Sequence, residues 1–580
     1  MIEQLKEIGE VTGDKYKYCD KPWYKTNGKM YEITIQLLCD DDCKFSYEGV
    51  QVVDYDKYNY QKYFFRDIRA GASSNYSPCG KVSKDIKKTF KNKIYRWYDK
   101  EYHNESLMEL LVESGPIYKD IMSIKLDTDA SYLMVTTING LYPNEMLSIQ
   151  GIVKEKIFRM RNKVKGNGQC FVCHKEGIVY GGYGPYASYS IDKQCYISGF
   201  KKKDAWKNFP LCEECCDKIF MGKKFMEEHL AFRLGGIDYY LIPQVVFDYE
   251  NNLMPVLEMY KNLEEKKQNL KELGDMSFVE EYDVLRQMTD MNDACILNFM
   301  FSERQQSKYL IHLYVEDMSP SRVRRVVDAI DYVNNIDFMK RFKMKLNFNY
   351  IRKFCNYMEE KSKPSIVQYM EMVANILKGV PVSHELLMWL IHKKLKKAFK
   401  DAIKNDNENY IWTTLEALSV LEFLNRLNLI DKTKEVNMVS IAVDNSAVES
   451  IQEFFNSRSK TFYNADTASV FLMGVLCNKL ILEQKMLSNK RNGSFKAPFL
   501  KQLKGFRMTE RDVRELYGKM VDKLIKYDEN YKYQNLQAIL SDLLSQGSCP
   551  WKMTLGEINY YFMLGFTLGK LDTFGYQGEE

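Results

Sequence analysis

Cys170-Phe-Val-Cys173 and Cys212-Glu-Glu-Cys215 are two Cys-x-x-Cys pairs near the middle of this 580-residue chain. Two residues separate the cysteines of each pair, so both thiolates of a pair can reach the same ion. Two such pairs complete a closed tetrahedral set of four sulfur ligands, which is the arrangement of structural Zn²⁺ sites. A closed site leaves no position open for a substrate. We therefore expect one zinc ion that stabilises a ribbon and takes no part in catalysis.

The ribbon is interrupted by an insertion, because 38 residues separate Cys173 from Cys212, whereas the usual loop has about 15–20. Residues 180–186 of the insertion form a Gly/Tyr stretch, Tyr-Gly-Gly-Tyr-Gly-Pro-Tyr. The alternative interpretation is four unrelated thiols among the fourteen cysteines of the chain. Three further donors lie nearby in the sequence, and a ligand swap between Cys215 and its neighbour remains open: Cys195, Cys216 and His174.

Length and composition indicate a multidomain globular protein. A chain of 580 residues divides into roughly three or four domains, and 45% hydrophobic residues suffice for a core in each. The polar start and the absence of an apolar run near 20 residues predict a cytoplasmic protein without a membrane segment. The other cysteines follow no disulfide pattern, as expected in a reducing compartment.

Periodicity along the chain predicts an α+β fold with a helical C-terminal part. We expect strands at 30–38 and 49–53, a helix at 83–98, and another at 221–234. The predicted domains are a mixed α/β N-terminal domain (1–165), an inserted four-cysteine zinc ribbon (166–220), a mixed middle domain (221–345), a helical connector (346–437) and an all-α C-terminal bundle (438–580).

Several helix starts are predicted from capping residues. Ser319 with Pro320 opens a helix that runs to about residue 334, and Asn464 can cap another from 465 to 482. Capping boxes are expected at Thr509 with Asp512 and at Thr554 with Glu557. Glycine inside a helix costs about 1 kcal/mol relative to alanine. We therefore expect close packing of helix backbones where glycines interrupt the C-terminal helices, at Gly474, Gly565 and Gly569.

The sequence carries no motif of an active site. It contains no GxxxxGK[ST], no HExxH and no GxSxG, and it has only six histidines. The stretch Gly235-Gly-Ile-Asp238 resembles the Gly-Gly-Asp-Asp turn of polymerase palms. Isoleucine replaces the first of the two acidic residues, so the pair that would hold two metal ions is incomplete. We expect an ordinary turn here and a protein that is not an enzyme.

Positive charge concentrates in short segments, although the net charge is only +5. Residues 81–104 contain eight basic residues against three acidic ones, and the predicted helix at 83–98 places lysines on one face and aromatic and aliphatic residues on the other. Such clusters suit phosphate groups, whereas the alternative is a solvated helix face. The candidate nucleic-acid-binding residues are Lys81, Lys84, Lys87, Lys88 and Lys91; Lys201, Lys202 and Lys203 in the ribbon insertion; and Lys490, Arg491 and Lys496.

Four stretches together resemble the large subunit of the type I-B CRISPR interference complex, Cascade. They are YEGVQVVDYDKYNYQKYFFRDIRAGASSNYSPCGKVS (47–83) with KTFKNKIYRWY; CFVC and FPLCEEC with YSIDK between them and YYLIP after; MSPSRVRRVVDAI; and ADTASVFLMGVLCNKLILEQ with EINYYFMLGFTLGKL. They occur in family order over nearly the whole chain. One departure is Cys79-Gly80-Lys81, where Thr-Ala-Lys is expected, so a hydroxyl contact at position 79 is in doubt.

The resemblance implies a subunit without catalytic activity in CRISPR antiviral defence. Such subunits hold the 5′ handle of the guide RNA, inspect double-stranded target DNA for the protospacer-adjacent motif and help to recruit the helicase–nuclease. They assemble with backbone and handle-processing subunits of Cascade. The rival interpretations are a type III-like polymerase or nuclease subunit, and a zinc-containing scaffold that binds only protein.

Residues 438–580 suggest a separate product of the same gene. In complexes of this kind a small helical subunit resembles the end of the large one. The codons for residues 434–437 can read AAAGAGGTGAAT, which places a purine-rich GAGG just before the Met438 codon. We therefore expect a small subunit that is translated from Met438.

Overall fold

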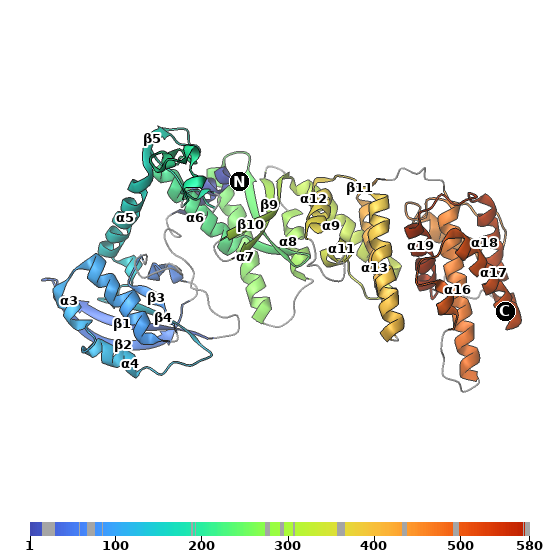
Figure 1. The fold of residues 1–580 in the computed structure, drawn as a ribbon, viewed down its shortest axis with the longest axis horizontal. Coiled ribbons are helices and arrows are strands. Elements are labelled where there is room, and N and C mark those ends of the chain that lie inside the picture. The colour runs from blue at the N-terminus through green and yellow to red at the C-terminus, as the bar shows by residue number, and fades with distance from the viewer. Residues whose placement is uncertain are drawn as a thin grey trace. The chain divides into compact units, whose positions relative to one another are not determined.

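The computed structural model describes residues 1–13, 29–56, 59–65, 76–83, 85–186, 189–191, 193–272, 279–289, 295–305, 308–355, 366–405, 407–431, 438–490, 498–571 and 574 (Figure 1). The chain forms two compact units. The first comprises Met1–Leu230, Ile242–Asn262 and Arg304–Tyr309, and the second comprises Ala231–Leu241, Leu263–Glu303 and Leu310–Glu580. The predicted fold class is confirmed, with sheets in the N-terminal and middle regions and a helical C-terminal region.

The first unit contains a four-stranded sheet with the strand order β2-β1-β4-β3. Strand β1 pairs antiparallel with β2 and parallel with β4, and β3 pairs antiparallel with β4. Ile33, Ile35 and Leu37 of β1 are completely buried, so this central strand anchors the core. Both predicted strands are confirmed. The bounds are β1 (Met30–Cys39), β2 (Phe45–Asp54), β3 (Cys79–Lys81) and β4 (Ser131–Ile138).

The predicted helix at 83–98 is present but begins and ends later. A continuous helical segment runs from 86 to 102, with widened π-type turns over much of its length, and Asp85 caps its start. Phe90, Ile94 and Trp97 are buried on its inner face as predicted. The segment comprises α2 (Ile86–Thr89), η4 (Phe90–Tyr95) and η5 (Tyr98–Tyr102). Other helices of the unit are α1 (Ile2–Thr12), η2 (Tyr60–Tyr63), α3 (Glu105–Leu110), α4 (Pro116–Ser123), η6 (Pro143–Glu145) and α5 (Leu147–Arg161).

The predicted helix at 221–234 was wrong at both ends. Helix α6 spans Glu213–His229, because Cys212 occupies its N-cap position and two glutamates lie in its first turn, where the helix dipole favours negative charge. Residues Ala231–Leu234 form strand β7 instead. Gly235 and Gly236 have φ values of 57° and 72°, which glycine adopts without strain. They turn the chain back into β8 (Ile237–Val245).

A second four-stranded sheet has the order β10-β9-β8-β7. Its consecutive strands β9 (Cys295–Gln305) and β10 (Lys308–Met318) are neighbours in the sheet and form a hairpin. Helix α9 (Pro320–Asn334) begins as predicted, because Ser319 Oγ accepts a hydrogen bond from the Arg322 backbone N–H at 3.3 Å. Two charged helices precede the hairpin, α7 (Tyr249–Glu272) and α8 (Val279–Thr289).

From residue 337 onward the regular elements of the described residues are helices, with one exception. A short two-stranded sheet, β11 (Val382–Ser383) with β12 (Ile430–Asp431), is the exception. The helices are α10 (Asp337–Arg341), α11 (Phe348–Cys355), α12 (Val367–Lys378), α13 (His384–Asn405), α14 (Asn409–Arg426), α15 (Val448–Asn456), α16 (Ala465–Lys490), η12 (Pro498–Leu503), α17 (Glu510–Lys526), η13 (Asn530–Tyr533), α18 (Gln534–Gln546) and α19 (Leu555–Leu568).

The predicted caps of this region are confirmed, and so are the glycine contacts at Gly474 and Gly565, whereas Gly569 is the C-cap residue of α19 and lies outside the helix. Both capping boxes are formed, at Thr509 and at Thr554. Helices α16 and α19 cross with their backbones in contact: a Cβ on Gly474 would lie 2.0 Å from the Phe562 carbonyl oxygen, and one on Gly565 would lie 1.8 Å from that of Phe471. Only glycine allows so close an approach.

The helices after residue 438 share a buried core with α13 and α14. His392 Nε2 of α13 donates to the Phe506 carbonyl at 2.8 Å, and the Phe506 ring lies 4.3 Å from that of Phe399 between centroids. Thr461 Oγ1 donates to the buried Glu422 carboxylate of α14 at 2.7 Å. The described helices after residue 438 are therefore packed within the second unit together with α13 and α14.

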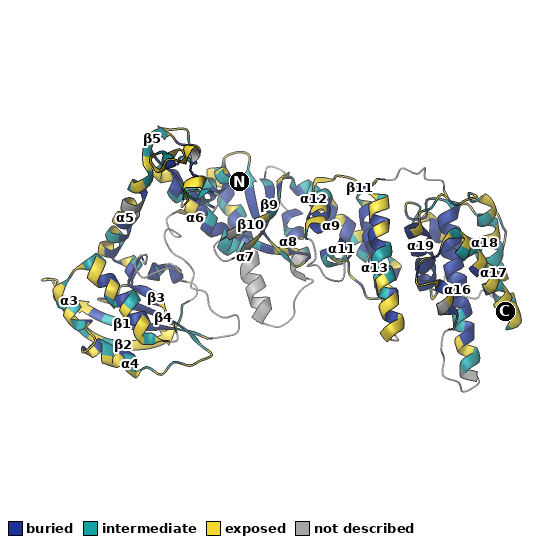
Figure 2. Ribbon diagram, in the orientation of Figure 1, coloured by how far each residue is buried: buried dark blue, intermediate teal, exposed yellow. Residues whose placement is uncertain are grey.

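Helix α16 is the described helix long and apolar enough to cross a membrane, and the prediction of no apolar run near 20 residues overlooked it. Its apolar stretch is 83% buried inside the protein. In Figure 2 most of α16 is dark blue, beside α19. The core helix of a soluble bundle has the same length and composition, so this helix is weak evidence for a membrane span.

Candidate metal centre and basic surfaces

The first cysteine pair lies in the turn of a two-stranded hairpin. Strands β5 (Lys165–Gln169) and β6 (Glu176–Tyr180) pair antiparallel. The turn between them is closed by two backbone hydrogen bonds, from the Cys170 N–H to the Lys175 carbonyl and from the His174 N–H to the Cys170 carbonyl, both 3.0 Å long. This turn holds Cys170 and Cys173 on one side.

The second pair is brought to the hairpin by a backbone bridge across the insertion. Tyr180 and Leu211 exchange two hydrogen bonds, 2.8 and 3.1 Å long. Cys212 follows directly and precedes α6, and Cys215 lies in the first turn of that helix. The bridge therefore brings the second cysteine pair next to the hairpin turn that holds the first pair, although the two pairs are far apart in the sequence.

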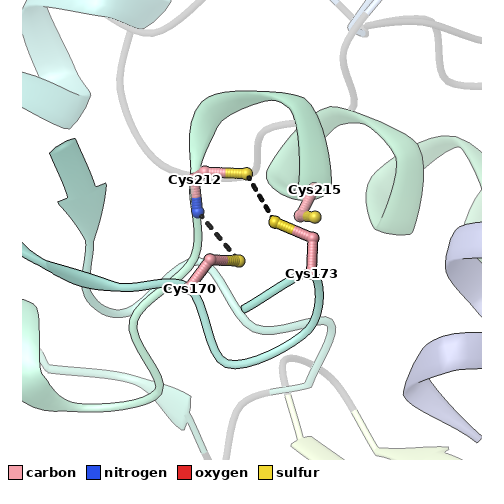
Figure 3. Close-up of side chains that lie close together, drawn as sticks. All are labelled: Cys170, Cys173, Cys212 and Cys215. Atoms are coloured by element: carbon pink, nitrogen blue, oxygen red, sulfur yellow. Dashed lines mark hydrogen bonds between the residues drawn. The ribbon is translucent and has the colours of Figure 1, made fainter. Parts of the chain in front are cut away.

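The four sulfur atoms converge in Figure 3 and lie within 4.8 Å of one another. The Sγ atoms of Cys173 and Cys212 are 3.7 Å apart. Zinc–sulfur bonds of about 2.3 Å in a tetrahedron place neighbouring sulfurs about 3.8 Å apart. Cys170 and Cys215 are buried, whereas Cys173 and Cys212 are partly exposed. The donor set and its spacing therefore fit a tetrahedral metal ion.

Backbone N–H groups prepare one of these thiols for ionisation. Burial disfavours the Cys170 thiolate, but N–H groups of Cys173, Cys212 and Val172 outweigh it and lower the pKa of Cys170 to about 7. The Cys212 N–H lies 3.4 Å from the Cys170 sulfur. Burial, together with the neighbouring Cys212 thiol, raises the pKa of Cys215. A cation at the centre favours the thiolate forms of all four.

The alternative donors lie outside this group. The Cys216 thiol donates a weak hydrogen bond to the Leu211 carbonyl at 3.9 Å, and burial raises its pKa to about 12. Cys195 is exposed. Neither these two thiols nor His174 belongs to the cluster among the described residues, so the geometry favours Cys215 over Cys216 as the fourth ligand.

Helix α6 is held in place by α1. A Cβ on Gly9 would lie 1.9 Å from the Lys218 carbonyl oxygen, and one on Gly222 would lie 1.7 Å from that of Leu5, so the two backbones touch. Lys218 Nζ adds hydrogen bonds to Glu10 at 2.5 Å and to Glu214 at 2.6 Å. The helix that carries Cys215 therefore has a fixed partner within its unit.

The glycines at 181 and 184 pack within the ribbon insertion. A Cβ on Gly181 would lie 1.9 Å from the Ala205 carbonyl oxygen, and one on Gly184 would lie 2.3 Å from the Tyr189 ring. The backbone at both glycines is therefore packed against other residues of the insertion. Lys201, Lys202 and Lys203 follow in an exposed segment at the start of η11 (Lys202–Lys207).

The positive charges of two lysines on the predicted basic helix are already paired with a carboxylate of this chain. Lys87 and Lys91 both form ion pairs with Glu113, at 3.6 and 3.2 Å, and all three side chains are about half exposed or more. A hydrogen bond from Lys91 and the nearby Lys87 lower the pKa of the Glu113 carboxyl. Lys88 is exposed on the same helix, and Lys81 is exposed at the end of β3.

The remaining predicted basic residues are not placed together with these. Lys84, Arg491 and Lys496 lie outside the described residues, as does the side chain of Lys490 at the end of α16.

The Gly-Gly-Ile-Asp stretch forms the tight turn predicted for it. Arg233 and Asp238 pair across β7 and β8, and Arg233 Nε lies 2.7 Å from Asp238 Oδ1.

One basic surface escaped the sequence analysis. Helix α13 contains the run His-Lys-Lys-Leu-Lys-Lys-Ala-Phe-Lys (392–400), whose charge density was the available signal. The periodicity of the run was assigned to a helical connector, so its charged face was not considered.

The sequence profiles of CRISPR-associated protein TM1802 (cas_TM1802) match three consecutive segments. The N-terminal domain matches residues 1–155, the central domain matches 167–318, and the C-terminal domain matches 346–580. No curated protein matches the chain in sequence.

Proposed function

Because the chain belongs to the TM1802 family of CRISPR-associated proteins, we propose that it is the large, non-catalytic subunit of a type I-B Cascade complex. In this role it works in the cytoplasm with other CRISPR-associated proteins and with nucleic acid. The observation that carries the proposal is the order of the three family matches, which together span nearly the whole chain.

The four-cysteine cluster binds one structural Zn²⁺ in this proposal. Cys170, Cys173, Cys212 and Cys215 supply all ligands, and zinc with four thiolates contributes folding free energy without an open position for substrate. The protein's own residues orient the site: the Tyr180–Leu211 bridge sets the spacing of the pairs, and α1 fixes α6.

The nucleic-acid partners are the guide RNA and the double-stranded target DNA. We propose that the subunit holds the 5′ handle of the RNA, reads the protospacer-adjacent motif and helps to recruit the helicase–nuclease. Base pairing reads the long target in such a complex, so the protein reads only a few base pairs and the shape of the backbone. The exposed lysines Lys81, Lys88 and Lys201–Lys203 support phosphate contacts at the handle and beside the motif.

The absence of a catalytic role is also part of the proposal. A polymerase palm would need a second carboxylate beside Asp238, but Asp238 is paired with Arg233 in a hairpin. This pairing disfavours the type III-like alternative.

A small subunit translated from Met438 is a further component of the proposed complex. Met438 is 72% exposed at the start of its segment, so the chain can begin there without loss of a buried side chain. The resulting product would lose the cover that α13 and α14 provide in the full chain, and a neighbouring subunit would have to replace it.

The test is expression of the full chain from its native gene together with its genomic neighbours. The expected result is a complex that contains a short RNA with a constant 5′ end, binds matched duplex DNA in a motif-dependent manner and loses that dependence when this chain is omitted. Intact-mass analysis of the same complex would reveal a species starting at Met438. A purified chain with neither RNA nor protein partners, and with no affinity for DNA, would overturn the proposal.

A further inference from the structure

Helix α13 presents a stripe of lysines on its solvent side. Lys393, Lys397, Lys400 and Lys404 follow the spacing i, i+4, i+7 and i+11, which places them on one face of a helix, and Lys396 lies beside them. Lys397, Lys400 and Lys404 are exposed. The opposite face is the core face, where Leu395, Phe399 and Ala402 are buried. We call the five lysines the α13 stripe.

A residue from a distant part of the sequence extends this surface. Phe506 is held against α13 by the hydrogen bond from His392 and by ring contact with Phe399. Arg507 follows it, is exposed, and lies close enough to disfavour the protonated forms of both His392 and Lys396. The fold therefore joins an arginine of the segment before α17 to the stripe.

Among the residues that the structure describes, four lysines of the stripe lack the acidic partners that the arginines of α17 have. Among the described residues, Lys396, Lys397, Lys400 and Lys404 form no ion pair and no side-chain hydrogen bond, and Asp401 on the same helix lies beyond ion-pair distance of them. In α17, by contrast, arginines pair with glutamates four residues away: Arg511 with Glu515 at 2.9 Å and Arg514 with Glu510 at 2.8 Å.

The electrostatics of Lys396 reflect this concentration of positive charge. Burial first, and then Arg507, Lys393 and Lys400, lower the pKa of Lys396. Cations that depress one another's pKa are stabilised when an anion approaches. An ordinary solvated helix face mixes both signs of charge, whereas this face is prepared for a polyanion.

We propose that the α13 stripe and Arg507 form a binding surface for the sugar–phosphate backbone of a nucleic acid. From Lys393 to Lys404 the helix rises about 16 Å, at about 1.5 Å per residue. One strand of duplex DNA carries a phosphate about every 3.4 Å along the axis, so the stripe matches four or five phosphates of one strand. Phosphate neutralisation by lysine needs no base readout, so the surface is independent of sequence.

An aromatic ring stands at the end of the stripe. Trp389 is 43% exposed, and Lys393 Nζ lies 3.5 Å from its ring centroid. An exposed indole beside a row of lysines is the combination with which proteins bind single strands, because bases stack on the ring. The backbone chemistry is common to duplex and single strand, and Trp389 offers a way to distinguish them.

The experiment compares two triple variants of the full chain that change charge equally. Lys397→Gln, Lys400→Gln and Lys404→Gln remove three cations of the stripe. The matched control, Lys519→Gln, Lys523→Gln and Lys526→Gln, removes three exposed lysines with helical spacing from α17. Binding of each protein to duplex DNA, single-stranded DNA and single-stranded RNA of unrelated sequence is measured by fluorescence anisotropy at several salt concentrations, and circular dichroism verifies the fold.

Three lost phosphate contacts reduce the slope of log K against log salt by about 2.7 on duplex and by about 2.1 on single strands, whereas the control leaves the slope within about 0.5. Trp389→Leu weakens binding about tenfold on single strands only, if these are the ligand. Equal slopes for both triple variants overturn the inference and return the stripe to a solvated face.

The inference rests on the proposed function only in that the chain binds nucleic acid. The experiment distinguishes failure of the inference from failure of the proposed function. Wild-type protein that binds nucleic acid while the stripe variant binds equally well overturns the stripe alone. Wild-type protein that binds no nucleic acid overturns both. Loss of a copurifying protein subunit from the stripe variant, with nucleic-acid binding unchanged, assigns the stripe to an acidic protein surface and overturns the inference as well.

Discussion

Glu32 is a buried carboxylate on which the core of the N-terminal sheet depends. It is 1% exposed in the central strand β1 and accepts hydrogen bonds from three hydroxyl groups: Tyr63 at 2.5 Å, Tyr142 at 2.7 Å and Thr34 at 2.6 Å. A buried charge is stable only when its lone pairs are satisfied in this way. Burial and the hydrogen bond to Glu32 raise the pKa of Tyr63.

Replacement of Glu32 by leucine is expected to lower the free energy of unfolding by at least about 3 kcal/mol, because it leaves buried hydroxyls without an acceptor. Glu48→Leu on the neighbouring strand is the control, since Glu48 is exposed and such a change is worth about 0.5 kcal/mol or less. Guanidinium unfolding of both variants measures the difference. Similar midpoints for the two would show that the network contributes no stability.

The sequence could not reveal this network, because its members come from positions 32, 63 and 142. Interactions between residues that are close together in the sequence are easier to predict from it. The caps at Ser319, Thr509 and Thr554 depend on residues three positions apart, so the pattern itself contains both partners. Arg507 beside α13 is the opposite case, since only the fold brings the two together.

Among the elements, the crossing of α16 and α19 offers the sharpest test of a predicted packing. Gly565→Ala would place a methyl group where the Phe471 carbonyl oxygen stands, 1.8 Å away, so the helices must separate at a cost of about 1–3 kcal/mol. Gly518→Ala in α17 is the matched control, because Gly518 is exposed with nothing within 4 Å of the added atom.

Alanine at position 518 is expected to stabilise its helix by up to about 1 kcal/mol. The two substitutions are chemically identical and should shift the thermal midpoint in opposite directions, which calorimetry can measure. A shift of the same sign in both variants would mean that the helix crossing is looser than the structure has it.

The four-cysteine cluster leads to a second prediction at the scale of the elements. Purified protein should contain about one equivalent of zinc by elemental analysis, and Cys215→Ser should lose it and destabilise the ribbon. Cys216→Ser should retain the metal, because Cys216 lies outside the cluster, and exposed Cys195→Ser is the control for loss of a thiol. Retention of zinc by the Cys215 variant and its loss from the Cys216 variant would reverse the ligand assignment.

The Cys-x-x-Cys pairs could be predicted from the sequence because the two cysteines of each pair are close together in it. The first residue of α6 could not be predicted in this way. The helical pattern after residue 221 is strong, but α6 begins at the second cysteine pair, with Cys212 as its N-cap and Cys215 and two glutamates in its first turn. Ala231, Phe232 and Leu234 fit a helix as well as a strand, and only the turn at Gly235 and Gly236 decides between them.

Across the whole molecule, the C-terminal helices depend on the helices before them. The family match for the C-terminal domain begins at residue 346, and α13 and α14 cover buried groups of the later helices, among them Thr461 and Phe506. A fragment of residues 346–580 is therefore expected to unfold cooperatively. The fragment 438–580 should unfold at a lower temperature or bind a hydrophobic dye, because it exposes the face that α13 and α14 cover in the full chain.

Thermal unfolding monitored by circular dichroism, with dye fluorescence in parallel, compares the two fragments. Addition of the other subunits of the complex to the shorter fragment should restore cooperativity if a neighbour covers the exposed face. Equal stability of the two fragments alone would mean that α13 and α14 contribute little to the C-terminal core.

The contact between α1 and α6 cannot form until α6 has been synthesised, long after α1. Residues 13–212, 200 in all, separate the two helices, and ribosomes add about 5–20 residues per second. For roughly 10–40 seconds α1 has no partner, although Leu5 and Ile8 become fully buried in the finished protein. The nascent chain thus displays a short apolar helix until the second cysteine pair has emerged, so the docking of α1 and the completion of the four-cysteine cluster fall in the same interval of synthesis.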